Sequence, residues 1–243
     1  MSATATNTRL RVQPAIAGRV IHLLVHDDGG LTELVEADPS LCAVVVRAAN
    51  SAHLGLSRRV SGVRQAMVLL GQDATTALAV ARTADLVFDD DVAGAPNPPT
   101  WVWPHAVAVA AASAWLARRM DVNPEQAYTA GLLQNLSVLS GERHDHEHGE
   151  RAAASLERWN FPDAIVSAVR LHHRPLDEVF APLDRLLVCA RTLAAEAGLP
   201  DGRPVTPMPQ VLRAADLGRN EVTAAVKEIR RALDALVRLA VPR

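Results

Sequence analysis

The chain has 243 residues, of which 49% are hydrophobic, and its 25 basic and 27 acidic residues give a formal net charge of -2. This length can bury one substantial core or two smaller ones. No block of five or six like charges occurs, so the sequence does not indicate DNA binding. The N-terminus is polar and no run of 18 apolar residues occurs, so we expect no membrane span and a cytoplasmic location.

The first half of the chain carries helix signals. Residues 1–13 are polar and are expected to form a flexible N-terminus, followed by a helix from about Pro14. Asp38 is a good N-cap and Pro39 suits the first helical position, so a helix should run from there to about residue 49. Ser61 is expected to cap the next helix, and another should end near residue 88. Residues 89–100 contain three aspartates, a glycine and three prolines, which predicts an exposed loop.

The second half continues the helical pattern. A long helix is expected to start near Trp103, and Asn123-Pro124 is a strong start signal for the next one. Further helices should begin near residue 146, at Pro162 and at Pro182. A Pro-rich loop at 200–209 then precedes two closing helices at about 211–217 and 221–239. Ala, Val and Leu dominate and aromatic residues are few, which favours closely packed helices over strands.

Several motifs in this order resemble the HDOD domain, an all-helical module of bacterial signalling proteins related to the HD superfamily. The N-terminal matches are the segments at 38–41, 47–52, 63–66 and 69–71, and the later ones are Trp103 with His105, the run from His148 to Pro162, and 172–175. The resemblance implies an all-α, multi-helix bundle in two halves. It divides the chain into an HDOD-like domain at 14–198, with halves at 14–88 and 101–198, and a C-terminal helical extension at 199–243.

Within the resemblance, 130–137 is similar to the Gly-Leu-Leu-His-Asp-Ile-Gly segment of HD enzymes, whose His-Asp pair binds a catalytic metal. Here that pair is Gln134-Asn135. The resemblance implies that the former active-site cleft consists of His105, Gln134, Asn135, His148, His172, His173 and Arg191. Arg191 stands near the position of a late metal-binding aspartate. No carboxylate remains at the matched positions.

These replacements predict a degenerate site. Neutral amides are weak metal ligands. A guanidinium about 5 Å from a divalent ion opposes its binding by about 7 kcal/mol at an effective dielectric near 20. We therefore expect no catalytic residue and no cofactor. If a divalent metal is retained, its ligands are expected to be His105, His148, His172 and His173.

Three interpretations of the histidines remain open. Backbone groups and helix ends can satisfy them, a metal can be held without catalysis, or the site can be a working hydrolase. In the run 144–148, every residue except His148 is expected to be solvated surface. The preferred hypothesis is a non-catalytic signal-transduction module that binds a protein partner or a small nucleotide. The alternative is a metal-dependent phosphohydrolase, specifically a phosphodiesterase.

The C-terminal helices have an apolar stripe at Val222, Val226, Ile229, Leu233, Leu236 and, just past the expected helix, Ala240. This stripe suits packing against the chain's own domain, and it also suits assembly into a homo-oligomer. Cys42 and Cys189 lie in apolar helical runs, which predicts buried free thiols.

Overall fold

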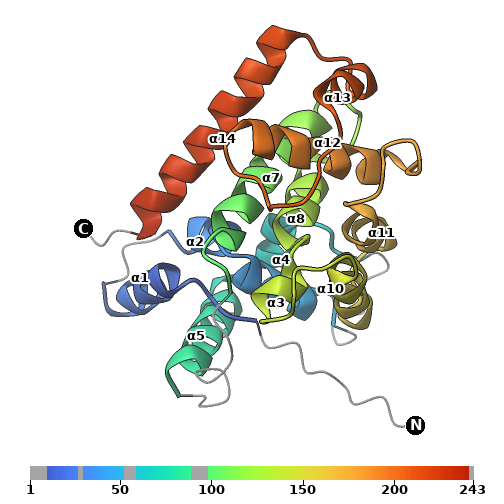
Figure 1. Ribbon diagram of the computed structural model, residues 1–243. Coiled ribbons are helices and arrows are strands. Elements are labelled where there is room, and N and C mark those ends of the chain that lie inside the picture. Colours follow the sequence, from blue (N-terminus) through green and yellow to red (C-terminus); the bar gives the residue numbers. More distant parts are fainter. Residues whose placement is uncertain (1–9, 27–29, 52–58, 89–97, 241–243) are drawn as a thin grey trace.

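The computed structural model describes residues 10–26, 30–51, 59–88 and 98–240 (Figure 1). Within these ranges the regular structure consists of helices and includes no strand, which confirms the predicted all-α class. The helices are α1 (Pro14–His26), α2 (Leu31–Ala37), α3 (Pro39–Ala49), α4 (Val63–Leu70), α5 (Gln72–Phe88), α7 (Val102–Ala117), α8 (Pro124–Leu133), α9 (Leu136–Leu139), α10 (His148–Arg158), α11 (Asp163–Leu171), α12 (Pro182–Glu196), α13 (Met208–Ala214) and α14 (Arg219–Ala240).

The predicted cap at Asp38 is present. Its Oδ1 accepts hydrogen bonds from the backbone N–H groups of Ser40 and Leu41, at 2.8 and 3.0 Å. Its Oδ2 accepts a third, at 2.7 Å, from the backbone N–H of Gln13. One buried carboxylate therefore starts α3 and also fixes the chain that precedes α1.

Two expectations for the N-terminal half need correction. Residues 10–13 are held in place, because Leu10 and Val12 are buried in the core and Gln13 is bonded to Asp38. Residues 1–9 lie outside the described residues. Ser61 does not cap α4, whose N-cap is Gly62 with no side-chain cap bond. Most of the predicted loop at 89–100, namely 89–97, also lies outside the described residues.

Helix α7 lies at the centre of the bundle and packs against α8, α12 and α14 (Figure 1). It is buried along most of its length, because Ala and Val side chains let neighbouring helices approach from several sides. The closest approach is at Gly131 of α8. A Cβ atom there would lie 2.8 Å from Ala110 Cα and 2.8 Å from Ser113 Oγ, so glycine is required for this contact.

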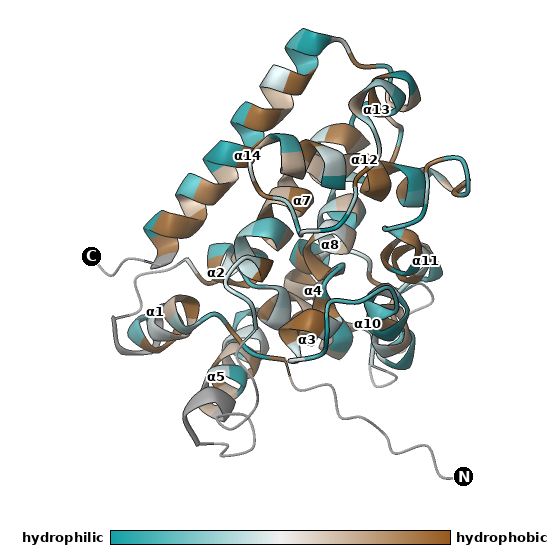
Figure 2. Ribbon diagram, in the orientation of Figure 1, coloured by the Kyte–Doolittle hydropathy of each residue, from teal (hydrophilic) through white to brown (hydrophobic). Residues whose placement is uncertain are grey.

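Helix α14 packs along α7 with Ala225, Ile229 and Leu236 buried. Hydrophilic and hydrophobic residues alternate along this helix (Figure 2). The C-terminal stripe thus serves packing within the chain. The buried residues of the described segments form one continuous hydrophobic core. Cys42 and Cys189 are buried free thiols within it, as predicted. No described helix has the length and apolar character needed to cross a bilayer.

Candidate functional site

The sequence-predicted cleft residues come from five segments that meet beside α7. His105 lies in the first turns of α7, and Gln134 and Asn135 lie at the junction of α8 and α9. The remaining positions are His148 at the start of α10, His172 and His173 just after α11, and Arg191 in α12. His173 is partly exposed, and the other six are buried.

Gln134 and Asn135 interrupt the helix at the position of the paired metal ligands. Asn135 has φ −103° and ψ 27°, so α8 ends and the short α9 begins at this residue. The Gln134 amide nitrogen lies 3.3 Å from His105 Nε2. The Gln134 Oε1 atom and both side-chain polar atoms of Asn135 are buried without a hydrogen-bond partner in the described structure. These amides are therefore available to a ligand or a water, but they supply no negative charge.

Arg191 points into the cleft, with its side chain 3% exposed. Its Nη2 and Nε atoms donate to Asp201 Oδ2 at 2.7 and 3.3 Å. Its Nη1 atom donates to the backbone carbonyl of His172 at 3.0 Å. The guanidinium is thus bonded on two sides inside the protein, next to the candidate histidines.

Asp201 is a site residue that the sequence did not identify. It lies in the Pro-rich loop after α12, and its side chain is 1% exposed. Its Oδ2 lies 3.9 Å from His105 Nε2 and 3.6 Å from His173 Nε2, and its Oδ1 accepts the backbone N–H of Arg203 at 3.0 Å. A carboxylate therefore does enter the cleft, from the segment assigned to the C-terminal extension. No local pattern distinguishes this aspartate from an ordinary turn residue.

The pair of Arg191 and Asp201 controls the charge of the cleft. Burial favours the neutral form of Asp201, but the guanidinium of Arg191 holds the pKa of this carboxyl below its ordinary value. Burial lowers the pKa of Arg191, and Asp201 opposes that shift. With both groups ionised, the pair adds no net charge to the cleft.

His105 is held in one orientation and one tautomer. Its Nδ1 lies 2.7 Å from the carbonyl oxygen of Leu199, which can only accept a hydrogen bond, so the proton is on Nδ1. Its Nε2 lone pair faces the Gln134 amide. Burial lowers the pKa of His105, which favours this neutral form. Leu199, two residues before Asp201, thus bonds directly to His105, which matches the first histidine of the family motif.

His148 and His172 are oriented in the same way. His148 Nδ1 lies 2.5 Å from the carbonyl of Asp145, and His172 Nδ1 lies 2.6 Å from the carbonyl of Val169. In the neutral rings both protons are therefore on Nδ1, and the two Nε2 lone pairs face each other at 3.2 Å. His173 Nε2 lies 3.1 Å from His148 Nε2. Burial lowers the pKa of His148 to about 4 and also lowers those of His172 and His173.

His144 also belongs to this cluster, which corrects the expectation that it is solvated surface. Its ring centroid lies 4.3 Å from that of His148, 4.9 Å from Trp101 and 5.8 Å from His173. One ring nitrogen each of His144, His148 and His173 lies within 4.8 Å of the other two, a spacing that could hold a metal ion. His146 has the expected exposed position, with its side chain 81% exposed.

Arg151 of α10 anchors the loop that carries His144. Its guanidinium donates to Glu142 Oε2 at 2.6 Å, Asp145 Oδ1 at 2.8 Å and the Arg143 carbonyl at 2.7 Å. The hydrogen bond from Arg151 is the main reason why the pKa of Asp145 falls to about 2. This anchoring by one arginine turns His144 inward, and the sequence spacing of 144–148 alone does not reveal it.

The fit of a hydrolytic metal can be judged from these groups. At Gln134 and Asn135 the available donors are neutral amides, and the Arg191 cation is buried nearby. Its counter-ion Asp201 is already engaged in two hydrogen bonds with it. The residues at the paired position therefore do not fit the metal centre of an HD enzyme.

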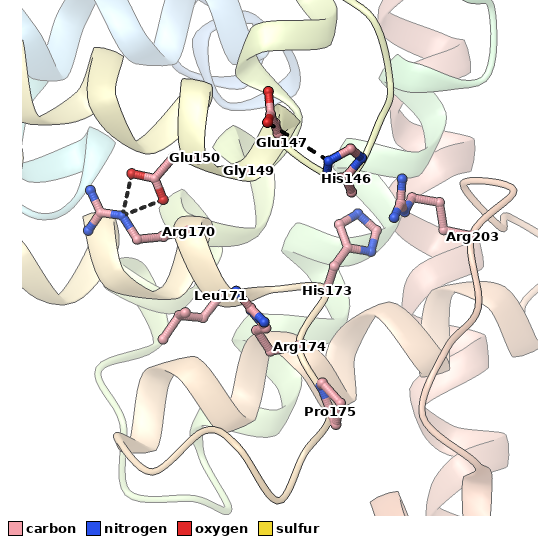
Figure 3. Close-up of a pocket in the computed structure, with 10 residues that line it drawn as sticks. All are labelled: His146, Glu147, Gly149, Glu150, Arg170, Leu171, His173, Arg174, Pro175 and Arg203. Atoms are coloured by element: carbon pink, nitrogen blue, oxygen red, sulfur yellow. Dashed lines mark hydrogen bonds and ion pairs between the residues drawn. The ribbon is translucent and has the colours of Figure 1, made fainter.

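A pocket of about 490 Å³ opens beside the histidines. Figure 3 shows His173, His146 and Arg203 gathered on one side of it, with Arg170 and Glu150 bonded to each other on the other side. Arg174 also lines this pocket. Its volume is in the range of small-molecule sites. No motif in the sequence marks Arg203, which lies two residues after Asp201.

Comparisons with known proteins agree with the fold. The family model described as HDOD domain matches residues 10–141, and the model described as HD domain matches residues 102–217. The second match includes Asp201 and therefore extends beyond the resemblance seen in the sequence. Comparison with curated proteins gives no significant match.

The similar solved structures include three from different organisms. The MmoQ response regulator from Methylococcus capsulatus str. Bath has a TM-score of 0.67 and 18% identity, covering 89% of this chain and 97% of its own. A virulence factor from Campylobacter jejuni subsp. jejuni has a TM-score of 0.56 and 16% identity, and the match covers 96% of this chain and 92% of that protein.

A proposed signal transduction protein from Marinobacter aquaeolei VT8 has a TM-score of 0.53 and 25% identity, and the match covers 99% of this chain and 61% of that protein. The first two likenesses concern the fold alone, because their identities are low. The HDOD model covers more than half of the chain and includes the motifs of the N-terminal half together with Trp103 and His105. The chain belongs to the HDOD family.

Proposed function

We propose that this chain is a non-catalytic signal-transduction module of the HDOD type. The observation that carries the proposal is the buried pair of Arg191 and Asp201, which places a guanidinium within the cleft where an HD enzyme holds its metal. Gln134 and Asn135 support it, because neutral amides replace both paired ligands. A scaffold that keeps the cleft without its hydrolytic charges is suited to binding.

The test is hydrolysis of bis(p-nitrophenyl) phosphate by purified protein without an affinity tag, with Mn²⁺, Mg²⁺ or Zn²⁺ added. We expect no turnover above the rate of the metal alone. Hydrolysis that depends on metal and is lost in His172→Gln, but retained in His146→Gln, would contradict the proposal. His146 is a matched control because it is an exposed histidine in the neighbouring loop.

The second candidate is a metal-dependent phosphodiesterase. The convergence of His148, His172 and His173 favours it, because neutral imidazoles are good metal ligands. In that function a bound metal would activate water for attack on a phosphodiester. Chelator-insensitive or absent turnover in the same assay would remove this candidate.

The module would act through a protein partner or a small nucleotide. The pocket beside His173 supports a nucleotide, because Arg203 and Arg174 line it and guanidinium groups bind phosphate well. Adenosine and guanosine mono- and triphosphates are suitable probes in equilibrium dialysis, with the free nucleosides as controls.

Nucleotide binding that weakens at least about tenfold in Arg203→Gln would support the small-molecule mode. Binding that is unchanged in this variant would remove the pocket from the proposal. If no nucleotide binds, the protein partner is the remaining mode. The buried free thiols Cys42 and Cys189 suit a cytoplasmic site of action.

A further inference from the structure

We propose that His144, His148 and His173 bind one divalent transition metal ion, with zinc as the best-fitting cation. This site differs from the metal centre of an HD enzyme, because it does not use Gln134, Asn135 or Arg191. It uses His144 instead, a residue outside the family motifs seen in the sequence. The inference does not depend on the proposed function, since a metal can be bound without hydrolysis.

The first argument is the distance between the ring nitrogens. His148 Nε2 and His173 Nε2 are 3.1 Å apart, and a ring nitrogen of His144 lies within 4.8 Å of the donor atoms of both. Zinc bonds to imidazole nitrogen at about 2.0–2.1 Å, so two ligands of a tetrahedral ion are separated by about 3.4 Å. The histidines are therefore close to the arrangement that zinc requires.

The second argument is the direction of the lone pairs. The Asp145 carbonyl fixes the proton of His148 on Nδ1, and the Val169 carbonyl does the same for His172. Their Nε2 lone pairs then face each other at 3.2 Å. Two facing lone pairs repel unless a proton or a cation lies close to them. Histidine ligands of metals usually donate the other ring nitrogen to a carbonyl or carboxylate, as His148 does here.

The third argument is the unused hydrogen-bonding capacity of His144. Its Nε2 is buried and has no hydrogen-bond partner in the described structure. An unpartnered buried nitrogen costs free energy, and a metal bond removes that cost. The loop that presents this ring is fixed through Arg151, so the position of the third ligand is built into the fold.

The surrounding charges also allow a cation here. Asp201 Oδ2 lies 3.6 Å from His173 Nε2, so the ion pair presents its carboxylate oxygen to this histidine. Arg191 is paired with the same carboxylate, so its charge is compensated. His173 lines the pocket of about 490 Å³, which gives the ion an entry path from solvent.

The test is zinc binding by chelator-treated protein without an affinity tag, measured in competition with a chromophoric chelator. We expect one zinc per chain. His144→Gln should lower the affinity at least about 100-fold, because a direct ligand is lost and even outer-shell partners contribute 10- to 100-fold. His22→Gln, at a histidine of α1 that does not line this pocket, is the control, and its affinity should be unchanged. A stoichiometry near zero, or equal effects of the two variants, would overturn the proposal.

Cobalt substitution gives a second readout that does not depend on any variant. Co²⁺ bound by three imidazoles in a four-coordinate site should give an intense visible absorption band, and excess zinc should abolish the band. Weak, six-coordinate absorption would contradict the site even if His144→Gln fails to fold. Neither measurement involves turnover, so the outcome is separate from that of the phosphodiester assay.

Discussion

The guanidinium of Arg191 donates to the carboxylate of Asp201 at 2.7 Å, and both side chains are almost completely buried. These residues lie in α12 and in the loop that follows it. Their pairing places a guanidinium inside the cleft, and Asp201 compensates its charge. This relationship accounts for the absence of hydrolysis that we propose, and it makes the loop part of the site.

Asp201→Asn should destabilise the protein by about 3–5 kcal/mol, because it leaves a buried guanidinium without its counter-ion. Chemical denaturation of the variant and the wild type measures the difference. Asp163→Asn is the control, since Asp163 pairs with Arg59 at the surface and should contribute less than about 1 kcal/mol. Equal effects of the two variants would mean that Arg191 is not buried as described.

The double variant Arg191→Met with Asp201→Leu should recover most of the stability that Asp201→Asn loses. Apolar side chains of similar size often replace a buried ion pair at little or no cost. The same denaturation experiment measures the recovery. A double variant that is less stable than Asp201→Asn alone would show that the pair has a structural role beyond charge compensation.

Gly131→Ala should destabilise the protein by about 1–3 kcal/mol, because the added Cβ would meet Ala110 Cα and Ser113 Oγ, each at 2.8 Å. Gly18→Ala is the matched control. It lies in the helix α1 with nothing within 4 Å of an added Cβ, so alanine should be neutral or stabilise by up to about 1 kcal/mol. Thermal unfolding of both variants distinguishes a close helix contact from a general glycine effect.

The carboxyl group of Asp38 should make the free energy of unfolding decrease as the pH rises from about 4 to about 6. Burial raises its pKa to about 6 from an ordinary value of 3.8, against the effect of hydrogen bonds from Gln13, Leu41 and Ser40. Between these values the native state holds a proton that the unfolded state has released, so raising the pH favours unfolding by up to about 3 kcal/mol. Asp38→Asn removes this contribution.

Urea denaturation at about pH 4 and at about pH 6 checks this prediction, with the two proteins compared at each pH. The stability of the wild type relative to Asp38→Asn should decrease between the two conditions. A relative stability that is constant or increases with pH would mean that the carboxylate is ionised throughout.

Ile229→Ala should destabilise the protein by about 2–4 kcal/mol, because Ile229 is fully buried where α14 packs against the bundle. Val237→Ala, at a residue that is 61% exposed, should change stability by less than about 0.5 kcal/mol.

If α14 also mediates homo-oligomer assembly, a chain truncated after Gly198 should elute in size-exclusion chromatography as a smaller species than the full-length assembly. An intact oligomer of the truncated chain would reject that role.

The fold could be predicted from the sequence because its helix starts have local chemical signals. Asp38 with Pro39, and Asn123 with Pro124, begin α3 and α8 as the capping rules indicate. The sequence favours Ser61 as the cap of α4, but Gly62 takes this position, because cap identity depends on backbone geometry that a single residue does not fix.

The candidate site was less predictable, because its decisive contacts join distant segments. The family motifs gave the histidines, the two amides and Arg191. They did not give Asp201, which follows a helix end in a Pro-rich loop and reaches the cleft through tertiary packing. The sequence likewise predicts a surface position for His144, because the ring turns inward only through the contacts that Arg151 makes with its loop.

The most direct test of the central claim is a crystal structure of the untagged protein grown in excess Mn²⁺, with anomalous difference maps. We predict that Arg191 and Asp201 stay paired and that no manganese peak lies within bonding distance of Gln134 or Asn135. Two manganese ions in the cleft, with Arg191 displaced toward solvent and acidic side chains as ligands, would contradict the account.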